Sequence, residues 1–284
     1  MAVVNTNVSA SLAQSALMRN ERALGSAMEQ LSTGSKINSA SDDSAGLGMA
    51  AKFTAQINGL DMAVKNANDG ISMISTAEGA LDEVAGMLQR MRELAVQSSN
   101  GTMTQEDRDY MDKEYQALDK EIDRIEQNTQ WNSTTILAGD AGQGGTSSPQ
   151  SKVKFQVSSN YASGSPSNDV IEVDFGKLST ATGSLSDVLT QNKAQNAIGT
   201  LDTAIKGVNE QRATFGAASN RLTHAVDNMT NIRVNAEASR SRIEDTDYGS
   251  TTSELAKAQI IAQAGTAMLA QANQSAQSVL SLLR

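Results

Sequence analysis

The sequence predicts a mainly α protein, with long antiparallel helices in a coiled-coil and bundle arrangement and a small β-hairpin region in the middle of the chain. Small and apolar residues recur at steps of three and four along both flanks of the 284 residues. The two prolines, Pro149 and Pro166, lie near the centre, so neither flank contains this helix breaker. Short β-prone runs separated by Gly, Ser, Asn and Pro begin at Trp131, Lys152 and Asp169.

The C-terminal segment carries the clearest pattern. No charged residue lies between Lys257 and Arg284. A heptad seam on one helix would consist of Leu255, Ala258, Ala262, Gly265, Leu269, Ala272, Ala276, Val279 and Leu283. Because alanine offers little apolar area to bury, at about 25 cal/mol per Å², we expect this helix to be stable only when it packs against neighbouring helices.

The N-terminal segment repeats the design. Val3, Ala10, Leu17, Leu24 and Leu31 are spaced seven apart. An antiparallel coiled coil between the two ends is the simplest arrangement that covers both stripes.

Longer helices are predicted between these ends. One of residues 41–43 can cap a helix whose apolar steps continue to about Ser98, a length on the order of 80 Å. Asn100 and Gly101 end it, and Thr104 followed by Asp107 begins an antiparallel partner.

Helix resumes near Asn192 and continues to a charged connector over residues 240–250. The predicted domain organisation pairs distant segments, with the middle of the chain at the distal tip. Its parts are an inner coiled coil from residues 1–40 and 241–284, a helical bundle from 41–138 and 191–240, and a short central β-hairpin and loop region from 139–190.

Composition argues against several classes of function. A net charge of −9 disfavours nucleic acid and anionic membranes as partners. The glutamines and serines of the uncharged C-terminal segment argue against membrane insertion. There is no cysteine, and the single histidine, His224, belongs to no zinc motif. Acidic pairs such as Asp42–Asp43 occur at helix starts, where capping explains them. We predict no catalytic residues, no metal site and no cofactor, and therefore no enzyme.

Five stretches carry a resemblance to a known family. They are LSTGSKINSASDDSAGLGMA from Leu31, QRMRELAVQSSNGT from Gln89, FGAASNRLTHAVDNMTNI from Phe215, SRIEDTDYGSTTSELAKAQI from Ser241, and the ending SVLSLLR. In these stretches, and in their order, the chain resembles bacterial flagellin, the subunit of the flagellar filament, over nearly its whole length.

The resemblance implies a structural subunit that polymerises into the extracellular filament used for swimming. Such a subunit is secreted through the flagellar type III export apparatus, with an export chaperone, and adds beneath a cap protein; the hook-filament junction protein is a further partner. Its termini would be disordered in the monomer and fold on assembly, so that the seam residues of both ends become the packing core of the polymer.

The stretch from Gln89 is similar to the segment of the family that a vertebrate Toll-like receptor contacts. The resemblance implies that the receptor would contact Gln89, Arg90, Leu94 and Glu114. The alternative is a solvated or subunit-facing helix surface.

Two further sets of residues follow from the resemblance. The ending Val279, Leu280, Leu282 and Leu283 is similar to the part of the family that cytosolic receptors sense and the export chaperone binds; the alternative is a plain helix end in a heptad core. Some flagellins carry O-glycans, for which Thr146, Ser147, Ser148 and Ser158 are candidates; the alternative is a plain serine-rich loop.

Two competing functions stay open at this point. The hook-filament junction protein shares related termini with flagellin but occurs in only a few copies. A free-standing coiled-coil binding module would form a defined oligomer instead of an open helical polymer.

Overall fold

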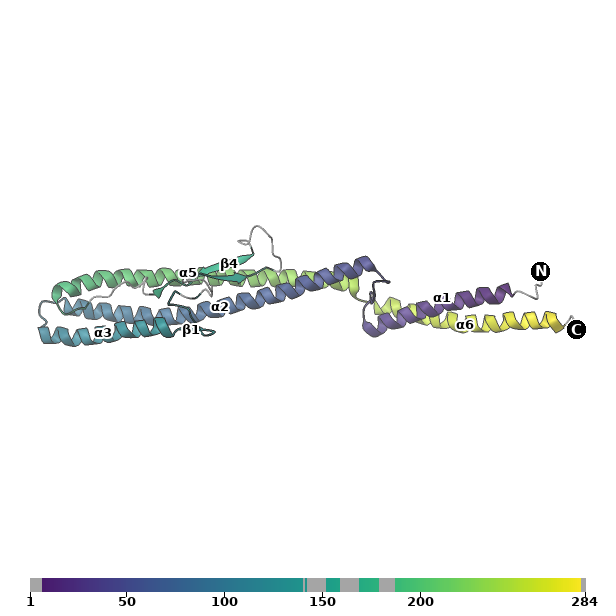
Figure 1. Cartoon of the computed structure of the whole chain (residues 1–284), viewed down its shortest axis with the longest axis horizontal. Helices are drawn as coiled ribbons and strands as arrows, with labels where there is room; N and C mark the ends of the chain where they lie inside the picture. The colour runs from purple at the N-terminus through teal and green to yellow at the C-terminus, as the bar shows by residue number, and fades with distance from the viewer. Residues whose placement is uncertain (1–6, 140, 142–151, 159–168, 179–186, 282–284) are drawn as a thin grey trace. The chain divides into compact units, whose positions relative to one another are not determined.

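The computed structural model describes residues 7–139, 141, 152–158, 169–178 and 187–281. Its long helices are α1 (Val8–Thr33), α2 (Ser44–Ser98), α3 (Gln105–Asn128), α5 (Gln191–Glu244) and α6 (Tyr248–Ser281) (Figure 1). Between α3 and α5 lie the strands β1 (Gln130–Trp131), β2 (Thr134–Thr135), β3 (Lys152–Gln156) and β4 (Val170–Asp174). The predicted mainly α class with a small β region in the middle of the chain is confirmed.

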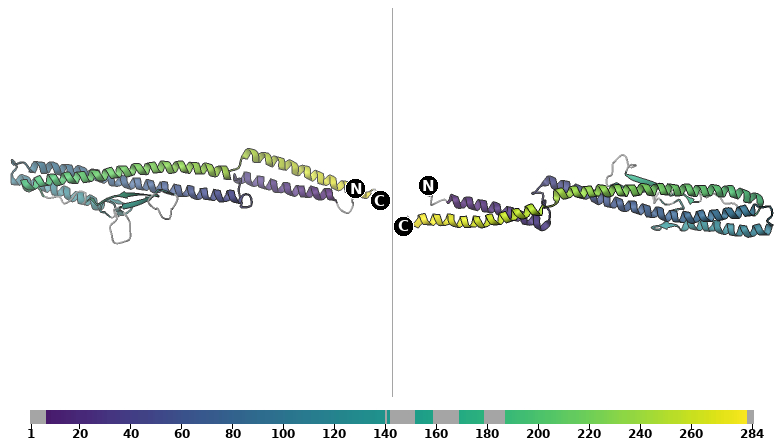
Figure 2. Two further views of the ribbon diagram at one scale, coloured as in Figure 1. Left: turned by 90° about the horizontal axis from the view of Figure 1, so that it is seen from above. Right: turned by 180° about the vertical axis from the view of Figure 1, so that it is seen from behind.

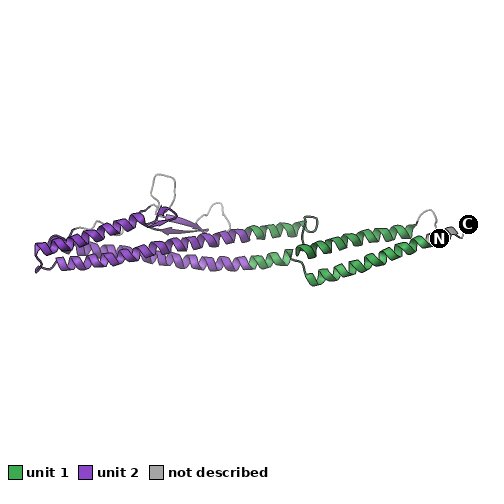
Figure 3. Cartoon of the chain, turned by 90° about the horizontal axis from the view of Figure 1, so that it is seen from below, with its two compact units in different colours: residues 1–55, 235–284 green, residues 56–234 purple. Residues whose placement is uncertain are grey.

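The chain divides into two compact units (Figure 3). Unit 1 consists of Met1–Ala55 and Asn235–Arg284, and unit 2 consists of Gln56–Val234. Helices α2 and α5 each contribute residues to both units.

Within unit 1, α1 and α6 lie side by side and run in opposite directions (Figures 1 and 2). Two side-chain amides tie them together: Asn7 Nδ2 donates to the Ala272 carbonyl at 3.2 Å, and Asn20 Nδ2 donates to the Ala258 carbonyl at 2.7 Å. Because the earlier residue of α1 meets the later residue of α6, the pair is antiparallel. The predicted coiled coil between the two ends of the chain is confirmed over the described residues.

Both ends of α1 have local explanations in the sequence. The Asn7 side chain accepts a hydrogen bond from the Ala10 N–H at 3.1 Å and caps the first turn. At the other end, Gly34 adopts a left-handed conformation with φ 75°, and its N–H donates to the Gln30 carbonyl. A residue with a side chain would be strained at this φ, so glycine suits this helix end.

The helix starts predicted for the bundle are confirmed. The Asp43 carboxylate accepts from the N–H groups of Ala45 and Gly46 at 3.0 and 2.9 Å, at the start of α2. Thr104 and Asp107 form a capping box at the start of α3, each side chain accepting from the backbone N–H of the other. These caps satisfy N–H groups that have no partner within the helix.

The predicted charged connector over residues 240–250 is wrong in its extent. Helix α5 continues to Glu244 and α6 begins at Tyr248, so only Asp245–Asp247 separates them. The Ser241 hydroxyl donates to the Asp245 carboxylate at 2.6 Å at the end of α5, and Asp247 accepts from the Gly249 N–H at 2.9 Å at the start of α6. Asp247 thus caps the start of α6, whereas Asp245 bonds to a side chain of the last turns of α5, and only a three-residue connection remains.

Unit 2 is a bundle of α2, α3 and α5 with a continuous apolar core. Helices α2 and α5 are antiparallel, because residues early in one pair with residues late in the other. These pairs are Arg92 with Asp202 at 2.6 Å, Asp82 with Arg212 at 3.0 Å, and Asp61 with Arg233 at 2.8 Å. The largest fully buried side chains include Tyr115, Phe175, Phe215, Leu88 and Leu222.

The central strands form two antiparallel hairpins, β1 with β2 and β3 with β4. The longer hairpin packs against the helices: Phe155 lies over Gly70 of α2, where an added Cβ would stand 3.0 Å from its ring. The Phe175 ring contacts Phe215 of α5, with centroids 5.1 Å apart. Gly70 leaves room for the close approach that the hairpin needs.

The expectation that the central segment forms the distal tip differs from this arrangement. The described strands lie along the middle of α2 and α5 (Figure 1). The turn between α2 and α3 lies at the end of the bundle where α5 begins (Figure 1). A two-stranded hairpin is marginally stable alone. Its apolar face, with Phe155, Ile171 and Val173 buried, therefore gains most by covering the helices.

The contact between the hairpin and the bundle can be tested at Phe215. We expect Phe215→Ala to lower the free energy of unfolding by about 3–5 kcal/mol, because the side chain is fully buried and its loss leaves a cavity. Urea denaturation followed by circular dichroism measures the change. The neighbouring Thr214→Ala, at an exposed position, should change it by only about 0.5 kcal/mol. Equal losses in the two variants would contradict the packing of Phe215.

Candidate assembly interface

The predicted seam residues line the contact between α1 and α6. Ala258 is buried, and the side chains of Ala10, Leu17, Leu24, Leu31, Leu255, Ala262, Leu269 and Ala272 are half-buried. Val3 and Leu283 lie outside the described residues, and Ala276 and Val279 fall on the last turns of α6. The heptad pattern therefore predicted the inward face of this helix pair.

Small residues let the two helices approach closely. An added Cβ at Gly265 would stand 2.8 Å from Cδ1 of Leu17. The same smallness limits the area that the pair can bury, since Ala27 is the buried residue of α1. At about 25 cal/mol per Å², this seam contributes far less to stability than the core of unit 2.

Large apolar side chains on the outer faces of both helices are left in contact with solvent. Leu12 of α1 is 66% exposed, and Ile260 and Met268 of α6 are 66% and 65% exposed. Val8, Met18, Met28 and Ile261 are also exposed. No charged residue of α6 follows Lys257 within the described residues. Exposed apolar groups without interspersed charge, as on α6 after Lys257, are typical of a surface that another protein chain covers.

The two chain connections of unit 1 are joined by backbone hydrogen bonds. The Lys36 N–H donates to the Glu244 carbonyl at 2.6 Å, and the Thr246 N–H donates to the Gly34 carbonyl at 3.0 Å. Ser35 and Asp245 form the bridge between these bonds. The α1–α2 connection is thereby fixed to the α5–α6 connection, which sets where the α1–α6 pair begins.

Asp42 orders the first of these connections. Its Oδ2 atom accepts from the backbone N–H groups of Ser39 and Asn38, at 2.9 and 3.1 Å, and from the Ser39 hydroxyl at 3.0 Å. These bonds, with the one from the Ser39 backbone largest, hold the pKa of the Asp42 carboxyl below its ordinary value.

The residues predicted to contact a receptor divide into exposed and buried ones. Gln89, Arg90 and Glu114 are exposed, and Arg90 Nε donates to Glu114 Oε1 at 2.9 Å across α2 and α3. Arg90 also pairs with Glu93 at 3.0 Å. The bond to Glu114, followed by that to Glu93, raises the pKa of Arg90. Leu94 is 2% exposed and packs in the bundle core, so its side chain supports this surface from beneath.

The other predicted site residues are only partly described. Leu280 lies on the last turn of α6, and Leu282 lies outside the described residues. Of the glycosylation candidates, Thr146, Ser147 and Ser148 lie outside the described residues, whereas Ser158 is half-buried two residues after β3.

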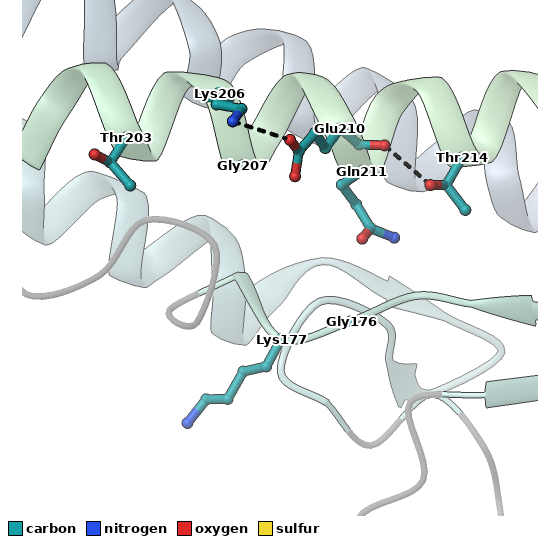
Figure 4. Close-up of a pocket in the computed structure, with 8 residues that line it drawn as sticks. All are labelled: Gly176, Lys177, Thr203, Lys206, Gly207, Glu210, Gln211 and Thr214. Atoms are coloured by element: carbon teal, nitrogen blue, oxygen red, sulfur yellow. Dashed lines mark hydrogen bonds and ion pairs between the residues drawn. The ribbon is translucent and has the colours of Figure 1, made fainter.

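An open recess of about 530 Å³ lies between α5 and the segment that follows β4 (Figure 4). Lys206 pairs with Glu210 at 3.7 Å on its rim, and Gln211 donates to the Asp174 carbonyl at 2.7 Å. The described residues contain no cluster of His, Cys, Asp and Glu arranged to hold a metal ion. Among the described helices, none has the length and apolar character needed to span a membrane.

Two family models match the chain. The bacterial flagellin N-terminal helical region matches residues 4–141, and the bacterial flagellin C-terminal helical region matches residues 198–283. The chain belongs to the bacterial flagellin family. The resemblance seen in the sequence motifs is thereby confirmed.

Several relatives match nearly the whole chain. It is 43% identical to a flagellin of Halalkalibacterium halodurans and 40% identical to flagellin FlaB2 of Treponema pallidum. It is 41% identical to the flagellar filament 33 kDa core protein of Treponema phagedenis. Each comparison covers 99% of this chain and 100% of the relative.

Two solved structures resemble parts of the chain. Bacillus cereus flagellin is 33% identical, with a TM-score of 0.50 over 58% of this chain and 88% of that one. A Vibrio parahaemolyticus chain described as a flagellar hook-associated protein has a TM-score of 0.55 over 72% of this chain and 100% of that one. Because its identity is 14%, this second likeness concerns the fold alone.

Sequence reasoning missed part of the surface of this flagellin. Leu12, Ile260 and Met268 fall outside the predicted seams, yet they are the large apolar residues that solvent reaches. A usable signal was present, since these large apolar residues lie outside the heptad positions of the two helices. The backbone hydrogen bonds that join the α1–α2 connection to the α5–α6 connection had no signal in the sequence, because they link residues that lie far apart in the chain.

The bonds to Asp42 predict a dependence on pH. Because its pKa is lowered on folding, the stabilisation is present above the ordinary carboxyl pKa of 3.8 and is lost as the pH falls through the lowered folded value. An NMR titration should place the midpoint of Asp42 below 3.8, with amide exchange of Ser39 accelerating over the same interval. In Asp42→Asn this acceleration should be absent. An Asp42 midpoint at or above the ordinary value would show that the loop bonds are not formed in solution.

Proposed function

We propose that the chain is the structural subunit of a bacterial flagellar filament, and that copies assemble through the outer faces of α1 and α6. The observation that carries this proposal is the combination of a seam of small residues with Leu12, Ile260 and Met268 largely exposed. A helix pair of this kind gains more stability from burial between subunits than from its own seam.

Assembly then completes the folding of unit 1. Ordering a residue costs about 1–2 kcal/mol of backbone entropy, and the thin seam offsets little of it. We propose that the ends of the chain are disordered in the monomer and become ordered when neighbouring copies cover them. Free subunits would thereby be kept from polymerising before a growing end provides the missing surface.

Family membership supports a proposal for the partners and the location. We propose secretion through the flagellar type III export apparatus to the extracellular filament, with contacts to the cap and hook-filament junction proteins. The export chaperone would cover the apolar ending formed by Val279, Leu280, Leu282 and Leu283 until export. Nucleic acid and membrane lipid have no place in this scheme. We infer no enzymatic activity, in keeping with relatives that are structural proteins.

A role as the hook-filament junction protein is the alternative. The hook-associated chain from Vibrio parahaemolyticus shares the fold at 14% identity, whereas relatives at 40–43% identity are flagellins and cover essentially the whole chain. This difference favours the filament subunit. Abundance separates the two roles, because sheared filaments consist mainly of the filament subunit.

Removing residues 251–284 tests assembly by α6. The truncated chain keeps all of unit 2 and should retain its helical circular dichroism, but it should form no filament when seeded, because α1 loses its partner and the outer face of α6 is gone. Electron microscopy of seeded samples provides the measurement. Filaments grown from the truncated chain would contradict the proposal.

A pair of point variants gives the matched control. Ile260→Asn removes an exposed apolar side chain from α6, and Gln259→Asn changes its exposed polar neighbour. Neither should alter the thermal unfolding of the monomer. Only Ile260→Asn should reduce the yield of sedimentable filaments, because a large apolar surface is lost from the contact.

We also propose that the surface around Gln89, Arg90 and Glu114 is a contact for the vertebrate Toll-like receptor of flagellin. What supports it is exposure: the Arg90 and Glu114 side chains are about half exposed and paired on the bundle surface. The alternative is that Arg90 and Glu114 form only a solvated ion pair, which contributes about 0–1 kcal/mol to the stability of the fold.

The double variant Arg90→Ala, Glu114→Ala distinguishes a receptor contact from a solvated ion pair. It should abolish receptor signalling by the monomer while changing the free energy of unfolding by less than about 1 kcal/mol. Reporter cells expressing the receptor give the readout. The matched control is Glu121→Ala, Arg124→Ala, which removes another exposed ion pair of the same unit and should leave signalling intact. Unchanged signalling in the first variant would count decisively against the contact.

The predicted O-glycans and cytosolic sensing of the chain end stand as proposals alongside it.

A further inference from the structure

The sequence contains two Asn-Gly dipeptides, Asn58–Gly59 and Asn100–Gly101. In this dipeptide the glycine nitrogen can reach the side-chain amide carbon of the asparagine, because no Cβ on the second residue obstructs the approach. Reaction requires a backbone that can bring the two atoms together. The structure places the two dipeptides in opposite environments.

Asn100–Gly101 lies in the turn between α2 and α3, and both residues are exposed. The Thr102 N–H donates to Asn100 Oδ1 at 3.2 Å. This bond turns the side-chain amide along the following backbone and withdraws electron density from Cγ, as donors do at a carbonyl under attack. Within the described part of the chain, no hydrogen-bond acceptor holds the Gly101 N–H.

Asn58–Gly59 lies well inside α2, fourteen residues after its start at Ser44. There the helix holds the Gly59 N–H in the backbone hydrogen-bond ladder and fixes the dihedral angles on both sides of it. The glycine nitrogen reaches the Asn58 amide carbon only when this part of α2 opens. The same dipeptide therefore serves as an internal control within one chain.

We propose that Asn100 is a site of spontaneous covalent modification by deamidation. The Gly101 nitrogen attacks Asn100 Cγ and forms a new C–N bond. The side-chain nitrogen leaves as ammonia, taking up the proton that the Gly101 nitrogen gives up, and a cyclic succinimide remains. Water then opens the ring at either carbonyl and yields aspartate or isoaspartate at position 100. No oxidant or enzyme takes part.

Arg108 links this chemistry to the structure of the turn. It is 7% exposed, and its Nη2 donates to the Asn100 backbone carbonyl at 3.0 Å and to the Met103 carbonyl at 3.4 Å. Ring opening at the Asn100 backbone carbonyl converts that same oxygen into a carboxylate oxygen of isoaspartate. The guanidinium polarises this carbonyl toward attack by water and pairs with the charge that results. We therefore expect isoaspartate to exceed aspartate.

The experiment follows both dipeptides in the full chain, incubated at mildly alkaline pH and digested with trypsin. Each lies in a tryptic peptide with a single asparagine, residues 53–65 and residues 93–108. Mass spectrometry should show conversion of Asn100 faster than that of Asn58 by roughly tenfold or more, because Asn58 reacts only when α2 opens. In urea-unfolded protein the two rates should converge. Isoaspartyl methyltransferase labelling measures the product ratio.

Gly101→Ala is the matched variant. Its φ lies outside the left-handed region, and an added Cβ would meet only the Gln191 side chain at 4.0 Å, so the fold should be kept. The added methyl group should suppress the conversion of Asn100, with circular dichroism unchanged. The inference would be overturned if folded protein kept Asn100 intact while unfolded protein did not. Equal rates at Asn58 and Asn100 in the folded chain, or an unchanged rate in Gly101→Ala, would overturn it as well.

Discussion

The thin seam between α1 and α6 is the constraint on which the behaviour of unit 1 depends. Close approach requires small residues, as at Gly265 beside Leu17, and small residues bury little area. The outer faces of both helices leave large apolar side chains such as Leu12 and Ile260 exposed, and these side chains can still be buried by another chain. The stability of both helices is therefore tied to what covers them, and this is the role proposed for neighbouring copies of the chain. The local structure, the energetics and the assembly of unit 1 follow from this one choice of side-chain size.

Unit 2, in contrast to the α1–α6 pair, is stabilised by large buried side chains. Tyr115, Phe215, Leu88 and Leu222 are fully buried, and the β3–β4 hairpin adds Phe155 and Phe175 over the helices. Large buried side chains give a core that needs no neighbouring chain. The ion pairs that join α2 to α5 are partly exposed and contribute modestly, so they favour the register of the bundle more than its stability. The core of unit 2 thus has the larger share of the buried apolar side chains of the chain.

The outer surface of this bundle has polar groups that contribute little to the stability of its core. Arg90 and Glu114 pair at half-exposed positions, and a change there costs the fold little. The turn at Asn100 ends α2 and at the same time frees the Gly101 nitrogen that a helix would hold. In both places the geometry is set by the bundle, while the side chains remain open to partners or to solvent.

The amino-acid sequence by itself determined the helical segments and the starts of α2 and α3, because caps such as Asp43 and Thr104 and the seven-residue spacing of Ala10, Leu17 and Leu24 act over one or two helical turns. It also determined the family, through long motifs in a fixed order. Only the tertiary structure decided that Leu94 is buried in the bundle core, that the hairpin covers Gly70, and that Lys36 and Thr246 fix the two connections together. These contacts join residues from separate segments, and a local pattern contains no information about which distant segment will cover it.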